Sequence, residues 1–352
     1  MSYISNKIKS LKNRLFFNSL RAIEVNALLL GKINTRQILN INKLSSLKEA
    51  EFKVFSQWGD DGIIQYLINK IPIKNHTFVE FGVEDYTESN TRYLLMNDNW
   101  SGLVIDGSYS NICDIKSSYY YWMYDLTAVH SFIDTDNINN ILIDNGFNGD
   151  IGILSIDIDG NDYWVWKAIS AISPSIVICE FNSNFGDKHR LTVPYSPTFQ
   201  RTNEHYSNLY FGASLPALKE LASEKGYSFI GANSNSINAY FIKSELVQFI
   251  DMDSLENLDL DIPLWLQWLE PIIYAKKNND TLYEIEDFDI DETDTDSFKH
   301  TLFLKLKNQL NKKKEKIKNK FIKSSDGSLN VGLNTILIDS LLKVIFKKFY
   351  FK

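Results

Sequence analysis

The chain has 352 residues, which is enough for one large domain or for one domain with extensions. Hydrophobic residues make up 44% of it and aromatic residues 13%, so the chain can build a sizeable core. The net charge of −7 argues against general binding to nucleic acid.

The first predicted element is a helix that runs to about residue 33. Four apolar residues recur at spacings of four, three and four: Ile4, Ile8, Leu11 and Leu15. Basic residues lie between them. Such an amphipathic helix can pack on its own domain or on a partner chain, or it can lie on a membrane surface. We treat residues 1–50 as an N-terminal helical segment.

From residue 76 on, short apolar runs alternate with helical stretches. The predicted parallel strands span residues 76–83, 101–108, 119–125, 151–159 and 173–182. Helices are predicted at about 88–98, 134–146 and 162–169. This alternation indicates a parallel sheet that is covered by helices on both faces.

The end of this domain differs from its beginning. Residues 214–227 have an amphipathic helical pattern, and strands at 227–233 and 238–246 follow with only a few residues between them. This gap is too short for a crossover helix, so the two strands must pair antiparallel. Five parallel strands, a helix and a terminal hairpin are the layout of a class I methyltransferase sheet, whereas NAD-binding doubly wound domains normally lack the hairpin. We predict an α/β, Rossmann-like fold with a seven-stranded, mostly parallel sheet over residues 51–250.

A long segment, residues 183–211, shows neither a helical nor a strand period. A loop of this length after a sheet strand is usually functional or disordered, and its tyrosines and phenylalanines argue against disorder. We predict that it forms a lid or a substrate loop.

Acidic residues follow the predicted strands. In a doubly wound sheet, ligands bind outside the carboxyl ends of the strands, where the strand order reverses. All five predicted parallel strands end in carboxylates, which chance placement would rarely produce, so we expect these residues to form one site. They are Glu80, Asp106, Asp125, Asp157, Asp159 and Glu180.

The first two strands indicate the kind of ligand. Gly82 is a single glycine where a dinucleotide fingerprint has three, and no pyrophosphate cradle is visible. Asp106 comes about 24 residues later, at the end of the next strand, where an acid can accept bonds from ribose hydroxyls. These features favour a mononucleoside such as S-adenosylmethionine over NAD.

Asp157 and Asp159 are two residues apart on a strand, so their side chains point to the same face. In a partly dry cleft they repel, and one takes up a proton unless a cation lies between them. That cation can be the sulfonium of a methyl donor, a divalent metal ion, or a basic side chain of the long loop, Lys188 or Arg190. An all-oxygen set of ligands for Mg²⁺ is also present: Asp159, Glu180 and Asn182.

Methyl transfer to an oxygen needs a hydroxyl held about 3 Å from the methyl group and a base that takes its proton. Asp159 and Glu180 are candidates for this base. His130, His189 and His205 are further candidates, because all three are predicted in loops or helix starts near the ligand edge. We assign Asp159, Glu180 and His189 as the catalytic candidates.

Several blocks of the sequence together resemble a known enzyme family. They are VFSQWGDDGII (54–64), FVEFGVEDYTESNTRYLL (78–95), GLVIDG (102–107), LSIDIDGNDYWVWKAI (154–169), IVICEFN (176–182) and residues 211–246. The chain is similar here to the FkbM-type S-adenosylmethionine-dependent methyltransferases, and more closely to a bacterial branch often found among surface-polysaccharide genes. The resemblance covers about residues 52–248. It implies a Rossmann-like fold, S-adenosylmethionine as the donor and O-methylation of a sugar or similar hydroxyl.

The candidate donor-binding residues are Ser56, Gln57, Glu80, Gly82, Asp106, Asp125 and Asp157. For all of these except Asp125 the resemblance implies the role, with Asp157 beside the methionine end of the donor. Glu84 and Asp85 stand where many methyltransferases have glycine. They motivate one alternative, a catalytically inactive binding or scaffold protein of a glycan-assembly complex. Another is a nucleotide-sugar enzyme that uses the same cleft.

The last part of the chain has two blocks of opposite charge. Residues 280–296 carry nine acids and no base, within a predicted connecting segment over 251–300. Residues 305–323 carry nine lysines and one glutamate. They belong to a predicted C-terminal extension, 301–352, that ends in a basic amphipathic helical pattern. This extension can lie on an anionic inner membrane, pack on the N-terminal helix or make a dimer.

The expected location and partners follow from these features. Cys113 and Cys179 lie among apolar residues, so we expect free, buried thiols and a reducing compartment. No uncharged run of about 18 apolar residues occurs, and the N-terminal stretches lack the pattern of a signal peptide. We expect a cytoplasmic protein, at the inner face of the membrane if the terminal helices bind it, with a carbohydrate acceptor as its partner.

Overall fold

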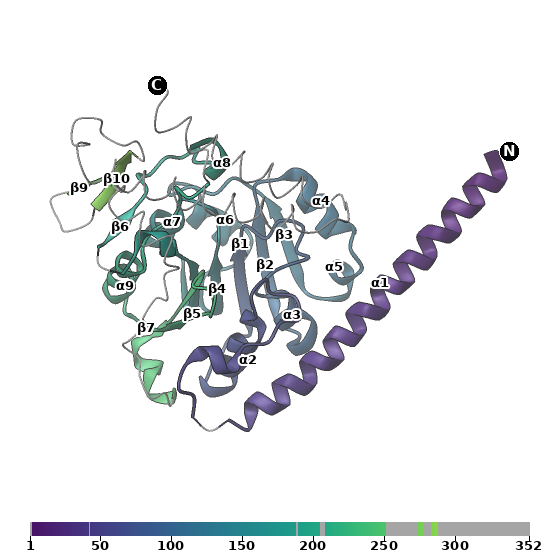
Figure 1. The fold of residues 1–352 in the computed structure, drawn as a ribbon, viewed down its shortest axis with the longest axis horizontal. Helices are drawn as coiled ribbons and strands as arrows, with labels where there is room; N and C mark the ends of the chain where they lie inside the picture. Colours follow the sequence, from purple (N-terminus) through teal and green to yellow (C-terminus); the bar gives the residue numbers. More distant parts are fainter. Residues whose placement is uncertain are drawn as a thin grey trace, which may run out of the picture. The chain divides into compact units, whose positions relative to one another are not determined.

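The fold is shown in Figure 1, a computed structural model of the chain. It describes residues 2–41, 43–187, 189–204, 208–250, 274–277 and 283–287, with side chains for those between 21 and 250. The predicted acidic connecting segment lies outside these residues except for two strands, β9 (Tyr274–Lys277) and β10 (Tyr283–Asp287), which form a small sheet with β6 (Leu191–Thr192). The predicted C-terminal extension lies wholly outside the described residues.

A seven-stranded sheet organises the described part of the chain, in the order β3-β2-β1-β4-β5-β8-β7 (Figure 1). Its strands are β1 (Thr77–Phe81), β2 (Ser101–Asp106), β3 (Leu126–His130), β4 (Gly149–Ile156), β5 (Ile172–Glu180), β7 (Tyr227–Ala232) and β8 (Asn238–Lys243). Strands β1 to β5 pair in parallel, and β8 pairs antiparallel with both β5 and β7. The predicted mostly parallel sheet with a terminal antiparallel hairpin is confirmed.

Helices connect the strands. They are α1 (Ser2–Leu39), α2 (Asp60–Lys70), α3 (Arg92–Asp98), α4 (Tyr109–Ser117), α5 (Tyr119–Met123), α6 (Ile138–Asp144), α7 (Asp162–Ala168), α8 (Arg201–Glu204) and α9 (Leu215–Glu224), with 3-10 turns η1 (Leu47–Ala50), η2 (Ser183–Phe185) and η3 (Ser244–Phe249). The predicted N-terminal helix is confirmed as α1, which extends beyond its predicted end. None of the described helices combines the length and the apolar character needed to cross a bilayer.

Side chains that alternate along each strand give the sheet a core on both faces. On β1, Phe78 belongs to one buried cluster, which it shares with apolar residues of α2, α3 and α4. Val79 and Phe81 belong to a second cluster, with residues of α6, α7 and α9. The two layers of helices therefore hold the strand ends in fixed positions.

The predicted third strand, residues 119–125, is wrong. Residues 119–123 form α5, and β3 begins only at Leu126. An aromatic run favours a strand where its side chains pack on cross-strand neighbours of a pleated, half-buried surface. Here Tyr120 is buried whereas Trp122 is 76% exposed, as on a helix with one face on the protein. Asp125 therefore precedes β3 and is exposed, instead of ending a strand at the ligand edge.

The two cysteines differ in environment. Cys179, on β5, is buried as predicted, whereas Cys113 is exposed and its predicted burial is wrong. Cys113 lies on α4, a helix whose buried residues are Ile112 and Ile115.

Candidate functional site

A cavity of about 420 Å³ lies at the carboxyl ends of the parallel strands. It is lined from the ends of β1, β2, β4 and β5, from the residues after β3, from the start of β8 and from the segment 183–211. Strand β1 lies between β2 and β4, so the strand order reverses at this point. Such a switch point is where open α/β sheets bind their ligands.

Gly82 brings backbone to the wall of the cavity. Its φ of 69° lies in the left-handed region, and a Cβ at this position would be 1.6 Å from the carbonyl oxygen of Asp157. Its N–H donates to the carbonyl oxygen of Ile105, at 3.0 Å. Only glycine fits between these strand ends, and it leaves bare backbone facing the cavity.

Glu80, at the end of β1, fixes the loop that follows. Its buried carboxylate accepts bonds from Ser89 Oγ at 2.6 Å, Asn90 N–H at 2.8 Å and Thr91 N–H at 3.1 Å, and also from the Thr91 hydroxyl. Burial raises the pKa of Glu80. Glu80 lines the cavity, but its hydrogen bonds hold the wall in place.

Asp106, at the end of β2, ties two loops together. Its Oδ2 accepts from Glu84 N–H at 2.8 Å, and its Oδ1 accepts from Ser108 N–H at 2.7 Å and Asn111 Nδ2 at 3.1 Å. A carboxylate offers about four acceptor positions, so about one stays open at the cavity wall. The predicted ribose acceptor therefore has capacity for a ligand.

The turn after Gly82 forms without the glycines that many methyltransferases have there. Glu84 and Tyr86 adopt positive φ values of 47° and 64°. Left-handed backbone costs a non-glycine residue about 1–2 kcal/mol. The bonds of this loop to Asp106 and Glu80 hold the conformation against that cost.

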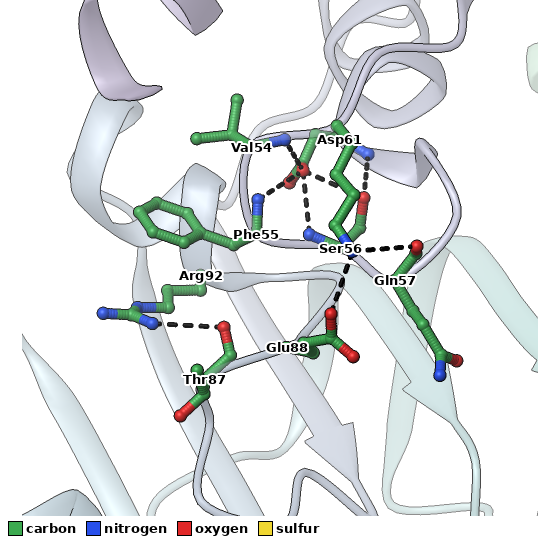
Figure 2. Close-up of polar contacts among 9 residues, drawn as sticks. Val54, Phe55, Ser56, Gln57, Asp61, Thr87, Glu88 and Arg92 are labelled. Atoms are coloured by element: carbon green, nitrogen blue, oxygen red, sulfur yellow. Dashed lines mark hydrogen bonds and ion pairs between the residues drawn. The ribbon is translucent and has the colours of Figure 1, made fainter. Parts of the chain in front are cut away.

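The implied donor residues Ser56 and Gln57 lie on a loop that Asp61 organises, as Figure 2 shows. Asp61 Oδ2 accepts the N–H groups of Val54, Phe55 and Ser56 at 2.7, 2.8 and 2.8 Å, and the Ser56 hydroxyl at 2.9 Å. Ser56 is buried and does not line the cavity, whereas Gln57 does. The structure therefore brings only Gln57 to the site.

Three acids meet at the other end of the cavity. One carboxylate oxygen from each of Asp157, Asp159 and Glu180 lies within 4.8 Å of the others. Glu180 is buried, and its Oε2 has no hydrogen-bond partner among the described residues. Burial, and then the charges of Asp157 and nearby acids, raise the pKa of Glu180 well above its usual range. We call these three residues the acid cluster.

The cation beside the acid cluster is Arg201, which the sequence reasoning missed. Its Nη1 lies 2.5 Å from Asp159 Oδ1, and both residues line the cavity. Of the two predicted cations, Arg190 pairs with Glu220 and Lys188 lies outside the described residues. Arg201 lies some forty positions along the chain from Asp159, and no local pattern links the two.

Asn182 does not join the acid cluster. Its Nδ2 donates to the carbonyl oxygens of Leu209 and Phe211, at 2.8 and 3.0 Å. These bonds fasten the far end of the segment 183–211. The Oδ1 of Asn182, the atom that would bind a metal ion, accepts from Asn184 N–H at 3.1 Å and from Asn184 Nδ2 at 2.7 Å, and Asn182 does not line the cavity. The oxygens that the structure brings together for a metal ion include Asp157 instead.

None of the described histidines lines the cavity. His130 ends β3, and its Nε2 is 3.1 Å from the carbonyl oxygen of Gly107. His189 is exposed and away from the lining, and His205 lies outside the described residues. Asp125 is likewise not brought to the site. The candidate bases at the cavity are therefore carboxylates.

The segment 183–211 reaches the cavity through Phe199 and Arg201. Phe199 packs on Gly160, where a Cβ would be 2.1 Å from its ring. Further lining residues that the sequence reasoning missed come after β3 and at the start of β8: Ser131, Phe132, Ile133, Ile237 and Asn238. The first three were missed because the third strand was predicted too early in the chain, at residues 119–125.

Comparisons with known proteins give no family. No family model and no curated protein matches the sequence. The solved N-terminal domain of EvdMO1 with SAH bound is similar at 10% identity, with a TM-score of 0.36, over 63% of this chain and 94% of that one. An O-methyltransferase from Bacillus cereus in complex with SAH is similar at 12% identity, with a TM-score of 0.36, over 62% and 89% of the two chains. An S-adenosylmethionine-dependent methyltransferase from Clostridium acetobutylicum is similar at 8% identity, with a TM-score of 0.33, over 55% and 93%.

At these identities and TM-scores the likenesses carry no argument about this chain, and its fold follows from its own sheet. The sheet has five parallel strands, with β1 and β4 at its centre and an antiparallel hairpin at one edge. It is a doubly wound, Rossmann-like α/β sheet.

Proposed function

We propose that the protein is an S-adenosylmethionine-dependent O-methyltransferase that acts on a sugar hydroxyl. The observation that carries the proposal is the cavity at the β1–β4 switch, where the bare backbone of Gly82 lies beside the carboxylate of Asp106. Its volume of about 420 Å³ falls in the range of small-molecule sites, roughly 300–1,000 Å³. The FkbM-type branch and a role in surface-polysaccharide assembly are part of the proposal, and the sequence blocks support them.

The residues at the cavity fit the donor. Asp106 keeps about one acceptor position for a ribose hydroxyl, and Gln57 lines the same wall. Among the lining residues seven are acidic, and Arg201 is the one cation. This excess of negative charge suits a ligand with a positively charged sulfur.

The charge of the cavity disfavours a nucleotide-sugar enzyme. A diphosphate needs positive charge beside it, and the one cation among the lining residues, Arg201, already pairs with Asp159. The alternative of an inactive binding protein was based on Glu84 and Asp85 in place of glycines. The loop with these residues forms the turn without further glycines, so this reason no longer holds.

When bound, the donor supplies a methyl group on a positively charged sulfur. The acid cluster can then take the proton that an acceptor hydroxyl loses. We assign this role to Glu180, because its Oε2 is buried, unpartnered among the described residues and part of the cavity lining. Its raised pKa makes it a stronger base than an exposed carboxylate. Asp159 is held by Arg201 and is assigned to orient the acceptor.

A bound Mg²⁺ is a second proposal for the same residues. Asp157, Asp159 and Glu180 offer oxygen ligands, which Mg²⁺ prefers, and the unpartnered Oε2 of Glu180 fits a ligand role. Mn²⁺ electron paramagnetic resonance reports such binding without any activity. Loss of the bound signal in Asp157→Asn, but not in Glu84→Gln, is the expected result. An absence of bound Mn²⁺ in the wild-type protein would remove the metal and leave Glu180 as the base.

The partners belong to the proposal as well. We infer a carbohydrate acceptor, no nucleic acid and a peripheral contact of the terminal helices with an anionic membrane, or a homo-oligomer made by them. The net charge of −7 and the basic amphipathic patterns of the two terminal segments support these inferences.

Titration calorimetry with S-adenosylhomocysteine tests the donor assignment, and transfer of a labelled methyl group to glycan extracts tests the acceptor class. We expect binding and transfer in the wild-type protein. Glu180→Gln should bind S-adenosylhomocysteine as the wild type does and lose methyl transfer. Asp159→Asn should lose most of its methyl transfer. If the wild-type protein does not bind S-adenosylhomocysteine, the proposed function is wrong. Binding without transfer to any extract would support the inactive alternative.

A further inference from the structure

Two loops form the wall of the cavity on the side of Gln57. The first wall loop, residues 53–57, contributes Gln57, and the second wall loop, residues 84–91, contributes Glu84, Glu88, Ser89 and Asn90 to the lining. Figure 2 shows the two loops side by side, with Gln57 and Glu88 facing the same space. Lys53 Nζ joins them, because it donates to the carbonyl oxygen of Gln57 at 3.1 Å and to Glu88 Oε1 at 2.9 Å.

Arg92 is a second link between the wall loops, and it is buried. Its Nη1 donates to the carbonyl oxygen of Thr87 in the second wall loop, at 3.1 Å. Its guanidinium carbon lies 4.3 Å from the ring centroid of Phe55 in the first wall loop (Figure 2) and 4.6 Å from that of Tyr120. A guanidinium in this position holds both loops at once.

Helix α1 supplies the counter-charge of Arg92. Arg92 Nη2 forms an ion pair with Glu24 of α1, and the side chains of these two residues are only 8% and 16% exposed. Glu24 also accepts a bond from the Tyr119 hydroxyl of α5. An Arg left buried without its partner is costly, so the position of Arg92 depends on Glu24.

The same helix touches the first wall loop directly. Gly31 of α1 lies against Val54, and a Cβ on Gly31 would be 2.6 Å from Val54 Cγ2. One turn further on, Thr35 Oγ1 is 3.1 Å from the hydroxyl of Tyr93, in α3. Helix α1 is therefore packed on the first wall loop and on α3, the helix that carries Arg92.

We propose that Glu24 is a positioning residue of the donor site, and that docking of α1 and donor binding are coupled through the Glu24–Arg92 ion pair. This inference rests on the proposed function, since it takes the cavity to be the donor site. The linkage works in both directions: an α1 that is docked holds the wall loops for the donor, and a bound donor stabilises the docked helix.

Hydrogen exchange on the wild-type protein tests the coupling without any variant. Addition of S-adenosylhomocysteine is expected to slow amide exchange of residues 21–39, although none of them lines the cavity. Calorimetry should show that Glu24→Gln binds S-adenosylhomocysteine about tenfold more weakly than the wild type. In this variant, addition of S-adenosylhomocysteine should no longer slow the amide exchange of α1. Arg36→Gln is the matched control, because Arg36 is an exposed residue of the same helix, and it should bind as the wild type does.

The outcomes separate the two proposals. No binding of S-adenosylhomocysteine by the wild-type protein overturns the proposed function, and the coupling with it. Wild-type binding with unchanged exchange of α1 overturns the coupling alone. Unchanged affinity in a Glu24→Gln protein that melts at the wild-type temperature also overturns it.

Discussion

Gly82 and Asp157 meet where the first and fourth strands of the sheet end. A Cβ on Gly82 would lie 1.6 Å from the carbonyl oxygen of Asp157, a distance that no side chain can tolerate. The two strands pair in parallel up to Phe81 and Ile156, so the contact is fixed by the register of the sheet. Both residues line the cavity, so this contact is part of its wall at the switch point.

We predict that Gly82→Ala lowers the free energy of unfolding by at least about 2 kcal/mol and abolishes binding of S-adenosylhomocysteine. The alanine costs about 1–2 kcal/mol for its left-handed backbone, and the clash with Asp157 adds to this. Gly146→Ala is a matched control, because Gly146 has a φ of 84° and no atom within 4 Å of its Cβ position. Urea unfolding of both variants should show the larger loss for Gly82→Ala; equal losses would contradict the clash.

The sheet could be predicted from the sequence because its signals are local. Strands buried on both faces read as continuous apolar runs, and the short gap before β8 excludes a crossover. The third strand failed because residues 119–123 are strongly aromatic, and whether such a run forms a strand depends on what packs against it. Helix α2 was not predicted, although Asp60 and Asp61 in its first turn are a helix-start signal.

Asp106 gives a prediction about the donor. Asp106→Asn should weaken binding of S-adenosylhomocysteine at least about tenfold, because an amide replaces the charged acceptor that we assign to the ribose. Glu84 N–H bonds Oδ2 and Ser108 N–H bonds Oδ1, so the single amide oxygen of the variant can keep only one of the two. The affinity is therefore measured on variant protein that a melting curve shows to be folded. Asp114→Asn removes an exposed acid outside the cavity lining, and its affinity should stay close to that of the wild type. Equal affinity in Asp106→Asn and the wild type would remove Asp106 from the ribose site.

The candidate site was predictable only in part. Side chains at strand ends could be inferred, because parallel strands bring their carboxyl ends to one edge, and Asp157, Asp159 and Glu180 do meet there. The position of Arg201 could not be inferred. It lies in a long segment without a helical or strand pattern, and packing, here of Phe199 on Gly160, decides the path of such a segment.

Asp60 gives a prediction about the hairpin. This buried carboxylate accepts bonds from Asn233 Nδ2 at 3.2 Å, Asn238 Nδ2 at 3.1 Å and the Tyr240 hydroxyl at 2.5 Å. Asp60→Ala leaves three buried donors without their acceptor, so we expect a loss of about 3 kcal/mol or more in the free energy of unfolding. Tyr240→Phe removes one donor and should cost about 1 kcal/mol. A similar cost for both variants would show that Asp60 does not organise the hairpin.

Asp61 gives a prediction about pH. Burial raises its pKa from 3.8 to about 6, so between these values the folded protein binds this proton more tightly than the unfolded chain does. The stabilisation from that proton is fully present below pH 3.8 and is lost as the pH rises through about 6. A pKa raised from 3.8 to about 6 corresponds to about 3 kcal/mol of stabilisation. The free energy of unfolding is measured for the wild type and for Asp61→Asn across this pH range. The wild-type value minus the variant value should fall by about 3 kcal/mol between pH 4 and pH 7. A flat difference would mean that the carboxyl of Asp61 titrates alike in the folded and unfolded chains.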